Sequence, residues 1–326
     1  MELDDLDWKL MNDWQRALPL VSRPFRVIAE SMQIEESDVI ARLRALLDAG
    51  VVSRVGATCR PNTLAASTLA AVAAPQGKVD EVAGIINSIE GVNHSYEREN
   101  DWNIWFVATG PTRAFVDAAL VEISQRTGLR VLDLRLVRPF NVDLGFALDG
   151  TGKMPPARPI DESVQLVDSD RAIMQGLSQG MKPVERPFKL LADALNRDED
   201  DVLNRIRRLA EAGVLSRIGL IVRHRPLGWR SNAMCVFNVP RENVAEKGLM
   251  LTKVPSVTLC YERRPDPEHW PYTLYCMIHG RSRAEALDVL SLARVRAELT
   301  GYDYQVLFST RCFKQTGALI DRKVNV

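Results

Sequence analysis

Four histidines are the side chains of this chain best suited to moving protons near neutral pH: His94, His224, His269 and His279. His224 follows Arg223 at the end of a predicted strand, and His269 lies in a proline-rich loop. His94 lies within a predicted strand, where a half-buried position is ordinary, and His279 ends an apolar run typical of a core strand. Which of them could act depends on the elements that position them.

The composition limits the classes of function. Lys plus Arg and Asp plus Glu each total 42 in a chain of 326 residues, so there is no basic excess to gather nucleic-acid phosphates. The five cysteines include no CxxC pair, which fits a reducing compartment and argues against a thiolate metal site. The N-terminus lacks the pattern of a secretory signal, and no apolar run is long enough to span a membrane. We therefore expect a cytoplasmic protein with no membrane partner.

The sequence repeats itself, and the repeat indicates how the chain is organised. Arg23-Pro24-Phe25 returns as Arg186-Pro187-Phe188, and the string at 49–56 returns with conservative changes at 212–219. The stretch between the two copies is rich in Gly and Pro and is typical of a linker. The chain is therefore two copies of one unit.

Each copy begins with apolar residues at helical spacing, at 39–47 and 202–210, followed by a β-rich stretch. This pattern is typical of a winged helix-turn-helix. The rest of the first half predicts a strand, a helix, two strands, a helix and a strand, at 68–74, 78–89, 91–98, 103–109, 112–127 and 129–138. The second half repeats this order, that of a ferredoxin-like unit, from Ala233 to about Thr310.

The predicted fold class is α+β, a tandem repeat of a winged helix-turn-helix plus a ferredoxin-like (βαββαβ) domain. Helices on one face of an antiparallel sheet leave the other face open, and we expect the other half of the chain to cover it, as a pseudo-dimer. The predicted domains are winged helix-turn-helix 1 (1–62), ferredoxin-like domain 1 (63–150), a linker (151–168), winged helix-turn-helix 2 (169–227) and ferredoxin-like domain 2 (228–326).

The order of modules resembles the Lrp/AsnC regulators, over nearly the whole chain and twice. Local strings are more specific, at 92–98, 103–106, 222–228, 260–265, 269–272 and 277–280. Together they resemble the two subunit types of siroheme decarboxylase, fused into one chain. One departure is Asn100, where the first subunit type often has His, and it moves the expected catalysis toward the second half.

The resemblance implies an enzyme, a carboxy-lyase, that converts the C12 and C18 acetates of siroheme to methyl groups, giving 12,18-didecarboxysiroheme for heme d1 or an alternative heme route. Loss of CO2 leaves electron density that the ring must absorb, so a positioned proton donor is needed. His224 and His269 are the expected catalytic residues, because neither has a counterpart in the first half. The iron arrives with the substrate, and His224 or His269 could be its axial ligand instead. No other cofactor and no metal site of the protein's own are expected.

Siroheme carries several carboxylates, so the resemblance also implies a pocket lined by cations, preferably arginines, whose fork holds a carboxylate through two bonds. Tyr96 and Tyr261 could stack on the macrocycle or donate to a carboxylate, although aromatic residues on strands usually belong to the core. Matched arginines could equally form ion pairs within the scaffold. The expected substrate-binding residues are His94, Arg60, Arg98, Arg223, Arg263, Tyr96, Tyr261, Arg138, Arg311 and Lys314.

Two other functions stay open from the sequence: a ligand-responsive DNA-binding transcription regulator of the Lrp/AsnC type, and a non-catalytic heme sensor. Acids at 35–38 and 198–201 begin the predicted recognition helices, where they suit the helix dipole but would repel phosphates. We expect those acids to be structural and DNA not to be a partner. The basic residues that follow on these helices are Arg42, Arg44, Arg205, Arg207 and Arg208. A homodimer, or association with a second decarboxylase, also stays open.

Overall fold

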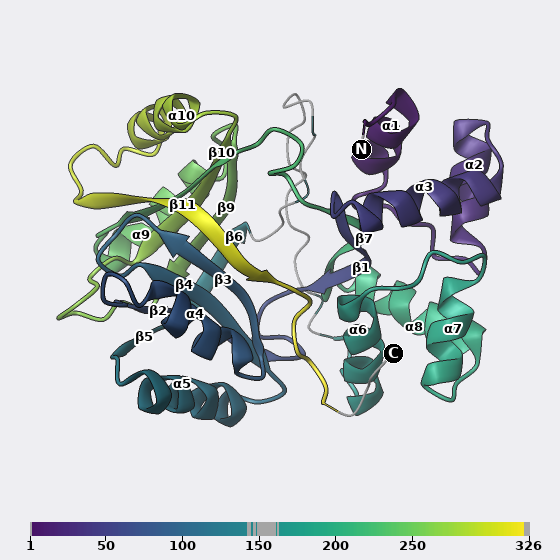
Figure 1. The fold of residues 1–326 in the computed structure, drawn as a ribbon, viewed down its shortest axis with the longest axis horizontal. Helices are drawn as coiled ribbons and strands as arrows, with labels where there is room; N and C mark the ends of the chain where they lie inside the picture. Colours follow the sequence, from purple (N-terminus) through teal and green to yellow (C-terminus); the bar gives the residue numbers. More distant parts are fainter. Residues whose placement is uncertain (1, 142–144, 146–147, 149–160, 162, 323–326) are drawn as a thin grey trace.

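The computed structural model describes residues 2–141, 145, 148, 161 and 163–322, which form two lobes (Figure 1). The first lobe contains both helix-turn-helix units. Its elements are α1 (Asp5–Asp13), α2 (Pro24–Met32), α3 (Glu36–Asp48), β1 (Val52–Cys59), α6 (Asp168–Gln179), α7 (Pro187–Ala194), α8 (Glu199–Glu211) and β7 (Leu215–Val222). Most of the predicted linker at 151–168 lies outside the described residues.

The repeated Arg-Pro-Phe string starts the second helix of each unit. Pro24 and Pro187 occupy the first turns of α2 and α7, where a missing N–H costs nothing, and Phe25 and Phe188 are fully buried behind them. The predicted helical face at 39–47 packs on the same core, which joins both halves of the chain. The two helix-turn-helix units are therefore one packed body.

The acids at the start of the recognition helices have structural partners. Arg23 donates to Glu36 and Arg186 donates to Glu199, so each Arg-Pro-Phe arginine contacts the first residue of the recognition helix, α3 or α8. Asp198 accepts from the backbone at the start of α8, as an N-cap. The structural role expected for the acids is confirmed at Glu36, Asp198 and Glu199. Four of the basic residues on these helices donate to acceptors within the lobe: Arg42, Arg44, Arg205 and Arg207.

The predicted wing strands form, but they do not fold back within their own halves. β1 pairs antiparallel with β7, and the repeated glycines face each other as Gly56 and Gly219. A Cβ on Gly56 would strike the carbonyl of Leu177, and one on Gly219 would strike that of Trp14. The two-stranded ribbon thus lies close against the chain beside it, and we correct the predicted wings to one ribbon shared by the two halves.

The second lobe contains nine strands and the helices that cover them, among the described residues. The elements are β2 (Ala66–Val72), α4 (Val79–Ser88), β3 (Val92–Arg98), β4 (Ile104–Gly110), α5 (Arg113–Thr127), β5 (Val131–Leu134), β6 (Leu136–Asn141), β8 (Ser231–Phe237), α9 (Arg241–Leu251), β9 (Val257–Arg263), β10 (Leu274–Gly280), α10 (Arg283–Arg296) and β11 (Tyr304–Gln315). The order of modules agrees with the predicted ferredoxin-like units.

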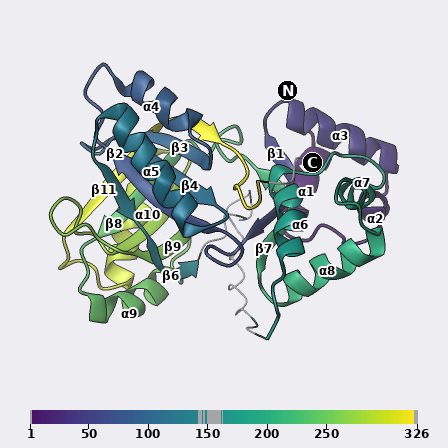
Figure 2. The ribbon, with the colours of Figure 1, turned by 90° about the horizontal axis from the view of Figure 1, so that it is seen from below.

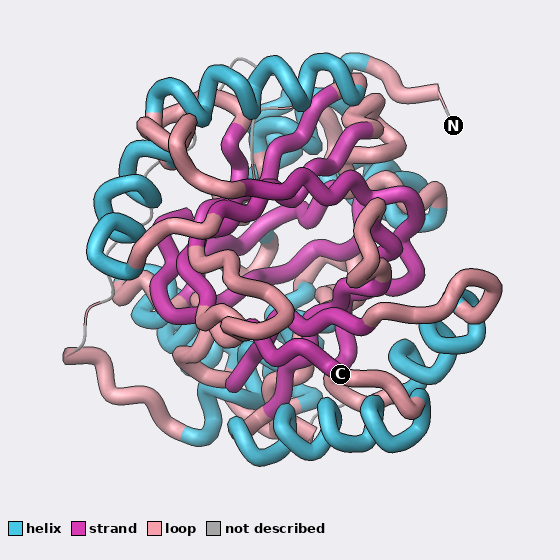
Figure 3. The backbone as a smooth tube through the Cα atoms, turned by 90° about the vertical axis from the view of Figure 1, so that its left-hand side faces the viewer, coloured by secondary structure: helices cyan, strands magenta, loops and turns pink. Residues whose placement is uncertain are grey.

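The last strand of each half crosses into the other half. The strand order is β5-β2-β4-β3-β11-β8-β10-β9-β6, so β6 pairs with β9 of the second half and β11 pairs with both β8 and β3. The single predicted strand at 129–138 is therefore two strands, with Arg135 between them. Because β5 and β6 are consecutive, the ends of this order meet, and the strands surround a common interior (Figure 3).

The interior of the ring is a core shared by both halves. Along β2, Leu69 and Ala71 face the interior, whereas Ala70 and Val72 pack under α4 and α5. Helices α9 and α10 cover the strands of the second half on the opposite side (Figure 2). The interior core includes Trp105 of the first half and Tyr275 of the second, so each open sheet face is covered by the other half, as predicted. Within the described ranges, no helix has the length and apolar character to cross a membrane.

Candidate functional site

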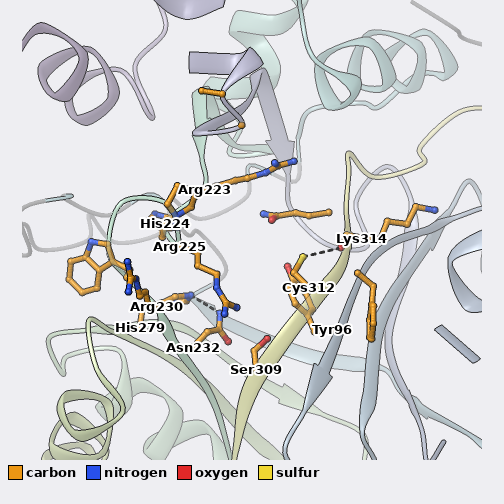
Figure 4. A pocket seen from close by; sticks show the side chains of 16 residues that line it. Tyr96, Arg223, His224, Arg225, Arg230, Asn232, His279, Ser309, Cys312 and Lys314 are labelled. Atoms are coloured by element: carbon orange, nitrogen blue, oxygen red, sulfur yellow. Dashed lines mark hydrogen bonds between the residues drawn. The ribbon is translucent and has the colours of Figure 1, made fainter. Parts of the chain in front are cut away.

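A cavity of about 680 Å³ lies between the two lobes (Figure 4). Ala49 and Gly50 of the first lobe contribute to it, and the second lobe contributes residues of the loop at 223–230, Tyr96 of β3, and Ser309 and residues 312–315 of β11. Its size is within the range of small-molecule sites. Because β11 crosses between the halves, one wall contains residues of both.

The loop after β7 carries three of the four cations of the cavity lining, Arg223, Arg225 and Arg230, together with His224. The backbone N–H of Arg223 donates to the carbonyl of Val51 at 2.8 Å, which ties the start of the loop to the first helix-turn-helix unit. The carbonyl of His224 then accepts from Leu227 and Trp229, so the chain turns tightly and returns to β8. This turn holds Arg223 and His224 in the lining of the cavity between the lobes.

His224 and His279 lie side by side in the wall, with ring centroids 5.9 Å apart. Burial lowers the pKa of His224 to about 3, helped by the neighbouring His279 and by Arg217. Burial likewise lowers the pKa of His279 to about 4, helped by the positive charge of Arg98. Both imidazoles are therefore neutral at pH 7.

The described residues that line the cavity include four cations and no acid. Arg225 and Arg230 are exposed, Arg223 is half-buried, and Nζ of Lys314 donates to the carbonyl of Asn87 at 2.9 Å. Burial lowers the pKa of Lys314. Such a wall has a positive potential that suits a ligand with several negative charges.

Tyr96 faces the cavity, and His94 lies behind it. His94 Nδ1 is 3.2 Å from the Tyr96 hydroxyl, and burial, with Arg54, lowers the pKa of His94 to about 4. Burial raises the pKa of Tyr96, so its hydroxyl stays protonated and can donate to a ligand. His94 would thus reach a ligand only through Tyr96.

Several sequence-predicted arginines lie away from this cavity. Arg138 Nε lies 3.6 Å from a carboxylate oxygen of Glu262. Arg311 forms ion pairs with Glu97, through Nε at 2.6 Å, and with Asp80, through Nη1 at 2.8 Å. These contacts are ion pairs of the scaffold. Arg60, Arg98, Arg263 and Tyr261 also lie outside the cavity lining.

Two of these residues, Arg263 and Tyr261, lie in the interior that the nine strands of the second lobe surround. Arg263 stacks over Tyr261, with its guanidinium carbon 4.5 Å from the ring centroid, and donates to the carbonyl of Leu134. Tyr261 is part of the interior core. Two residues that match in the two copies of the repeat therefore need not both line the cavity, as Tyr96 and Tyr261 show.

His269 lies in a different part of the molecule. Its Nδ1 is 3.3 Å from Asp266, and the edge of its ring contacts Trp102. The neighbouring Trp270 is buried and donates to the hydroxyl of Tyr275 at 2.8 Å, so the loop is packed into the interior core. His269 is therefore not among the residues that line the cavity.

Sequence reasoning missed part of the cavity wall. Arg225 could have been predicted as a lining residue, because it lies within the string at 222–228 that carries the family resemblance. No sequence pattern pointed to four other lining residues, because only the path of the loop and the crossing of β11 bring them to the cavity. They are Arg230, Asn232, Ser309 and Cys312. No group of three His, Cys, Asp or Glu side chains suited to a metal ion occurs among the described residues.

Comparisons with known proteins agree with this arrangement. Residues 7–52 and 170–215 match the siroheme decarboxylase NirDL-like HTH domain, and residues 64–140 and 226–314 match the AsnC-like ligand binding domain. A siroheme decarboxylase NirDL subunit of Paracoccus denitrificans is 53% identical over 321 residues, covering 98% of both chains. The chain belongs to the siroheme decarboxylase family.

Two further relatives of this siroheme decarboxylase show how the family is built. The siroheme decarboxylase NirD subunit of Stutzerimonas stutzeri is 43% identical over 148 residues, which is 45% of this chain and 97% of that subunit. The crystal structure of a siroheme decarboxylase NirDL in complex with an iron-uroporphyrin III analogue is 28% identical, with a TM-score of 0.67, and covers 98% of this chain and 95% of that one. Siroheme decarboxylation is thus the activity of this chain, and a transcription regulator is not favoured.

Proposed function

We propose that siroheme binds in the cavity between the lobes and loses the carboxyl groups of its C12 and C18 acetates there. The observation that carries this proposal is the cavity wall, with four cations and no acid among its described residues. Each charge-assisted hydrogen bond to a carboxylate contributes about 1.5–3 kcal/mol, so a few of them fix the orientation of the macrocycle. The solved relative that contains an iron-uroporphyrin III analogue supports a ligand of this class.

The reaction replaces a carboxylate by a proton. The bond between the methylene carbon and the carboxyl carbon breaks, its electron pair passes into the conjugated ring, CO2 leaves, and a proton completes the methyl group. His224 is the proton donor in this proposal because it lines the cavity next to Arg223. Carboxylates brought close to His224 favour its charged form and raise its pKa from the value that burial lowers, so substrate binding prepares the donor.

The iron in this proposal belongs to the substrate, and no further cofactor takes part. His224 as axial ligand of that iron is the competing assignment, and it predicts a shift of the siroheme absorption bands when His224 is replaced. The five cysteines are free, which supports the cytoplasm as the location in this proposal. The paired halves support a pseudo-dimer that suffices for binding, and a homodimer or a second decarboxylase is not needed.

The test is anaerobic incubation of the purified chain with siroheme, followed by mass spectrometry of the pigment. We expect loss of two CO2 from the wild type. His224→Gln should lower kcat by about 100-fold or more, the scale of a positioned general acid, with siroheme still bound. His269→Gln, which changes a histidine outside the cavity, should stay within about twofold, because no proton donor is lost.

Three results would contradict the proposal. Siroheme that binds and is never converted would indicate a sensor. Full turnover by His224→Gln would exclude His224 as the donor. A loss in His269→Gln equal to that in His224→Gln would place the chemistry elsewhere.

A further inference from the structure

A chain of hydrogen bonds runs from the buried Arg98 through Asn232 and His279, which line the cavity, to Thr258. Arg98 is 6% exposed, and its Nη1 donates to Asn232 Oδ1 at 3.2 Å and to the carbonyl of Leu307 at 3.0 Å. Asn232 Nδ2 lies 2.9 Å from His279 Nε2, as drawn in Figure 4, and His279 Nδ1 lies 2.8 Å from Thr258 Oγ1. The four side chains come from β3, β8, β10 and β9, so both halves of the molecule contribute.

The direction of every bond in this chain follows from its first member. Arginine only donates, so the amide of Asn232 must present its oxygen to Arg98 and its NH2 group to His279. His279 Nε2 therefore accepts, and the ring proton of the neutral imidazole is on Nδ1, facing Thr258. The hydroxyl of Thr258 passes the donor role on to the carbonyl of Met277 at 3.2 Å.

Protonation of His279 would break this order. A proton on Nε2 would face the NH2 group of Asn232, and turning that amide would bring its NH2 group against the guanidinium of Arg98. Among the described residues, the side chains hydrogen-bonded to the two ring nitrogens of His279 are Asn232 and Thr258, which are neutral, and the next member of the chain, Arg98, is a cation. The lowered pKa of His279 agrees with this geometry.

We propose that Arg98, Asn232 and Thr258 are positioning residues that hold His279 in its neutral Nδ1–H tautomer, so that His224 alone delivers the proton. This inference rests on the proposed function and deepens it. The rings of His224 and His279 are 5.9 Å apart, a distance at which two positive charges disfavour each other. By keeping His279 neutral, the buried network leaves His224 free to become charged when the carboxylates of the substrate arrive.

The tautomer is measured directly by ¹⁵N NMR of the full chain with labelled histidine rings, free of siroheme at neutral pH. His279→Asn identifies the His279 signals by their loss. We expect Nδ1 in the protonated range and Nε2 in the unprotonated range. An Nε2–H tautomer or an imidazolium at His279 would overturn the proposal.

A matched pair of variants at Thr258 tests the link to catalysis. Thr258 is 3% exposed and does not line the cavity; Thr258→Val keeps its shape without the hydroxyl, and Thr258→Ser keeps the hydroxyl. We expect Thr258→Val to lower kcat by about tenfold, the scale of one buried hydrogen bond, with KM for siroheme within about twofold, and Thr258→Ser to restore kcat. Wild-type kcat and unchanged His279 signals in Thr258→Val, or no rescue by Thr258→Ser, would overturn it.

Asn232→Asp is a second variant of nearly unchanged size. Its carboxylate accepts from both Arg98 and His279, so the His279 Nε2 signal should move to the protonated range and kcat should fall; an unmoved signal would overturn the proposal. The NMR result does not depend on turnover. If wild-type protein failed to decarboxylate siroheme, the proposed function would fail, while the tautomer of His279 would still be decided by its own signals.

Discussion

Among individual residues, the cations of the cavity matter for what the site can bind. Arg223 is half-buried between the lobes, and neither it nor Lys314 has an acidic neighbour among the described lining residues. Arg311, by contrast, is exposed and paired with Glu97 and Asp80. The same side-chain type thus lines the cavity at one position and forms ion pairs of the scaffold at the other.

We predict that Arg223→Gln weakens siroheme binding by about tenfold, the lower end for one charge-assisted hydrogen bond. The measurement is a titration followed by siroheme absorbance, repeated at higher salt, where the difference should shrink. Arg311→Gln is the matched control and should leave Kd within about twofold, because it removes a charge outside the cavity. Equal losses in the two variants would contradict the assignment of the cavity.

The sequence could identify a residue of the cavity lining only where neighbouring residues in the chain determine its position. Arg223 and His224 were predictable because the family string at 222–228 places both on one loop. Arg138 and Arg311 were not, because their acidic partners approach only after the last strands cross between the halves. His269 was predicted from a loop insertion, and the insertion instead packs Trp270 into the core.

Among the elements, the ribbon of β1 and β7 connects the site to the helix-turn-helix lobe. Val51 precedes β1 and accepts from Arg223, which follows β7, so the ribbon fixes where the cavity loop begins. Its two facing glycines let α6 and the segment after α1 lie against it. Hydrophobic periodicity predicted both strands but not their pairing, because a period of two reveals which face is buried and not which strand is the partner.

We predict that Gly56→Ala lowers the free energy of unfolding by about 1–3 kcal/mol, because its methyl group would overlap the carbonyl of Leu177. Urea unfolding is the measurement. Gly84→Ala in α4 is the control: a Cβ there meets no atom within 4 Å, so we expect a gain of about 0.5–1 kcal/mol from helix propensity. A Gly56→Ala variant as stable as the wild type would show that the ribbon is looser than described.

Across the whole molecule, the two halves depend on each other. The helix-turn-helix core and the interior core of the ring both contain residues from the two halves, and β11 pairs with strands of both. The tandem fold class was predictable because the repeat is visible in the sequence. The crossing of the last strands was not, since the repeat shows that two units exist and not how they exchange strands.

We predict that the chain divided into residues 1–160 and 161–326 is active only when both pieces are produced together. Each piece alone would expose its half of the two shared cores, so we expect the pieces to copurify in equal amounts and each alone to aggregate. Size-exclusion chromatography and the siroheme assay are the measurements. A relative that corresponds to one half makes such a division chemically reasonable. A single piece that stays monomeric and folded would refute the prediction.

Ser309 and residues 312–315 of β11 form one wall of the cavity, and they follow every other lining residue in the sequence. Synthesis proceeds from the N-terminus, so a ribosome adds this wall after the loop at 223–230 and after His279. A nascent chain that has not yet reached β11 therefore has a cavity that is open on this side.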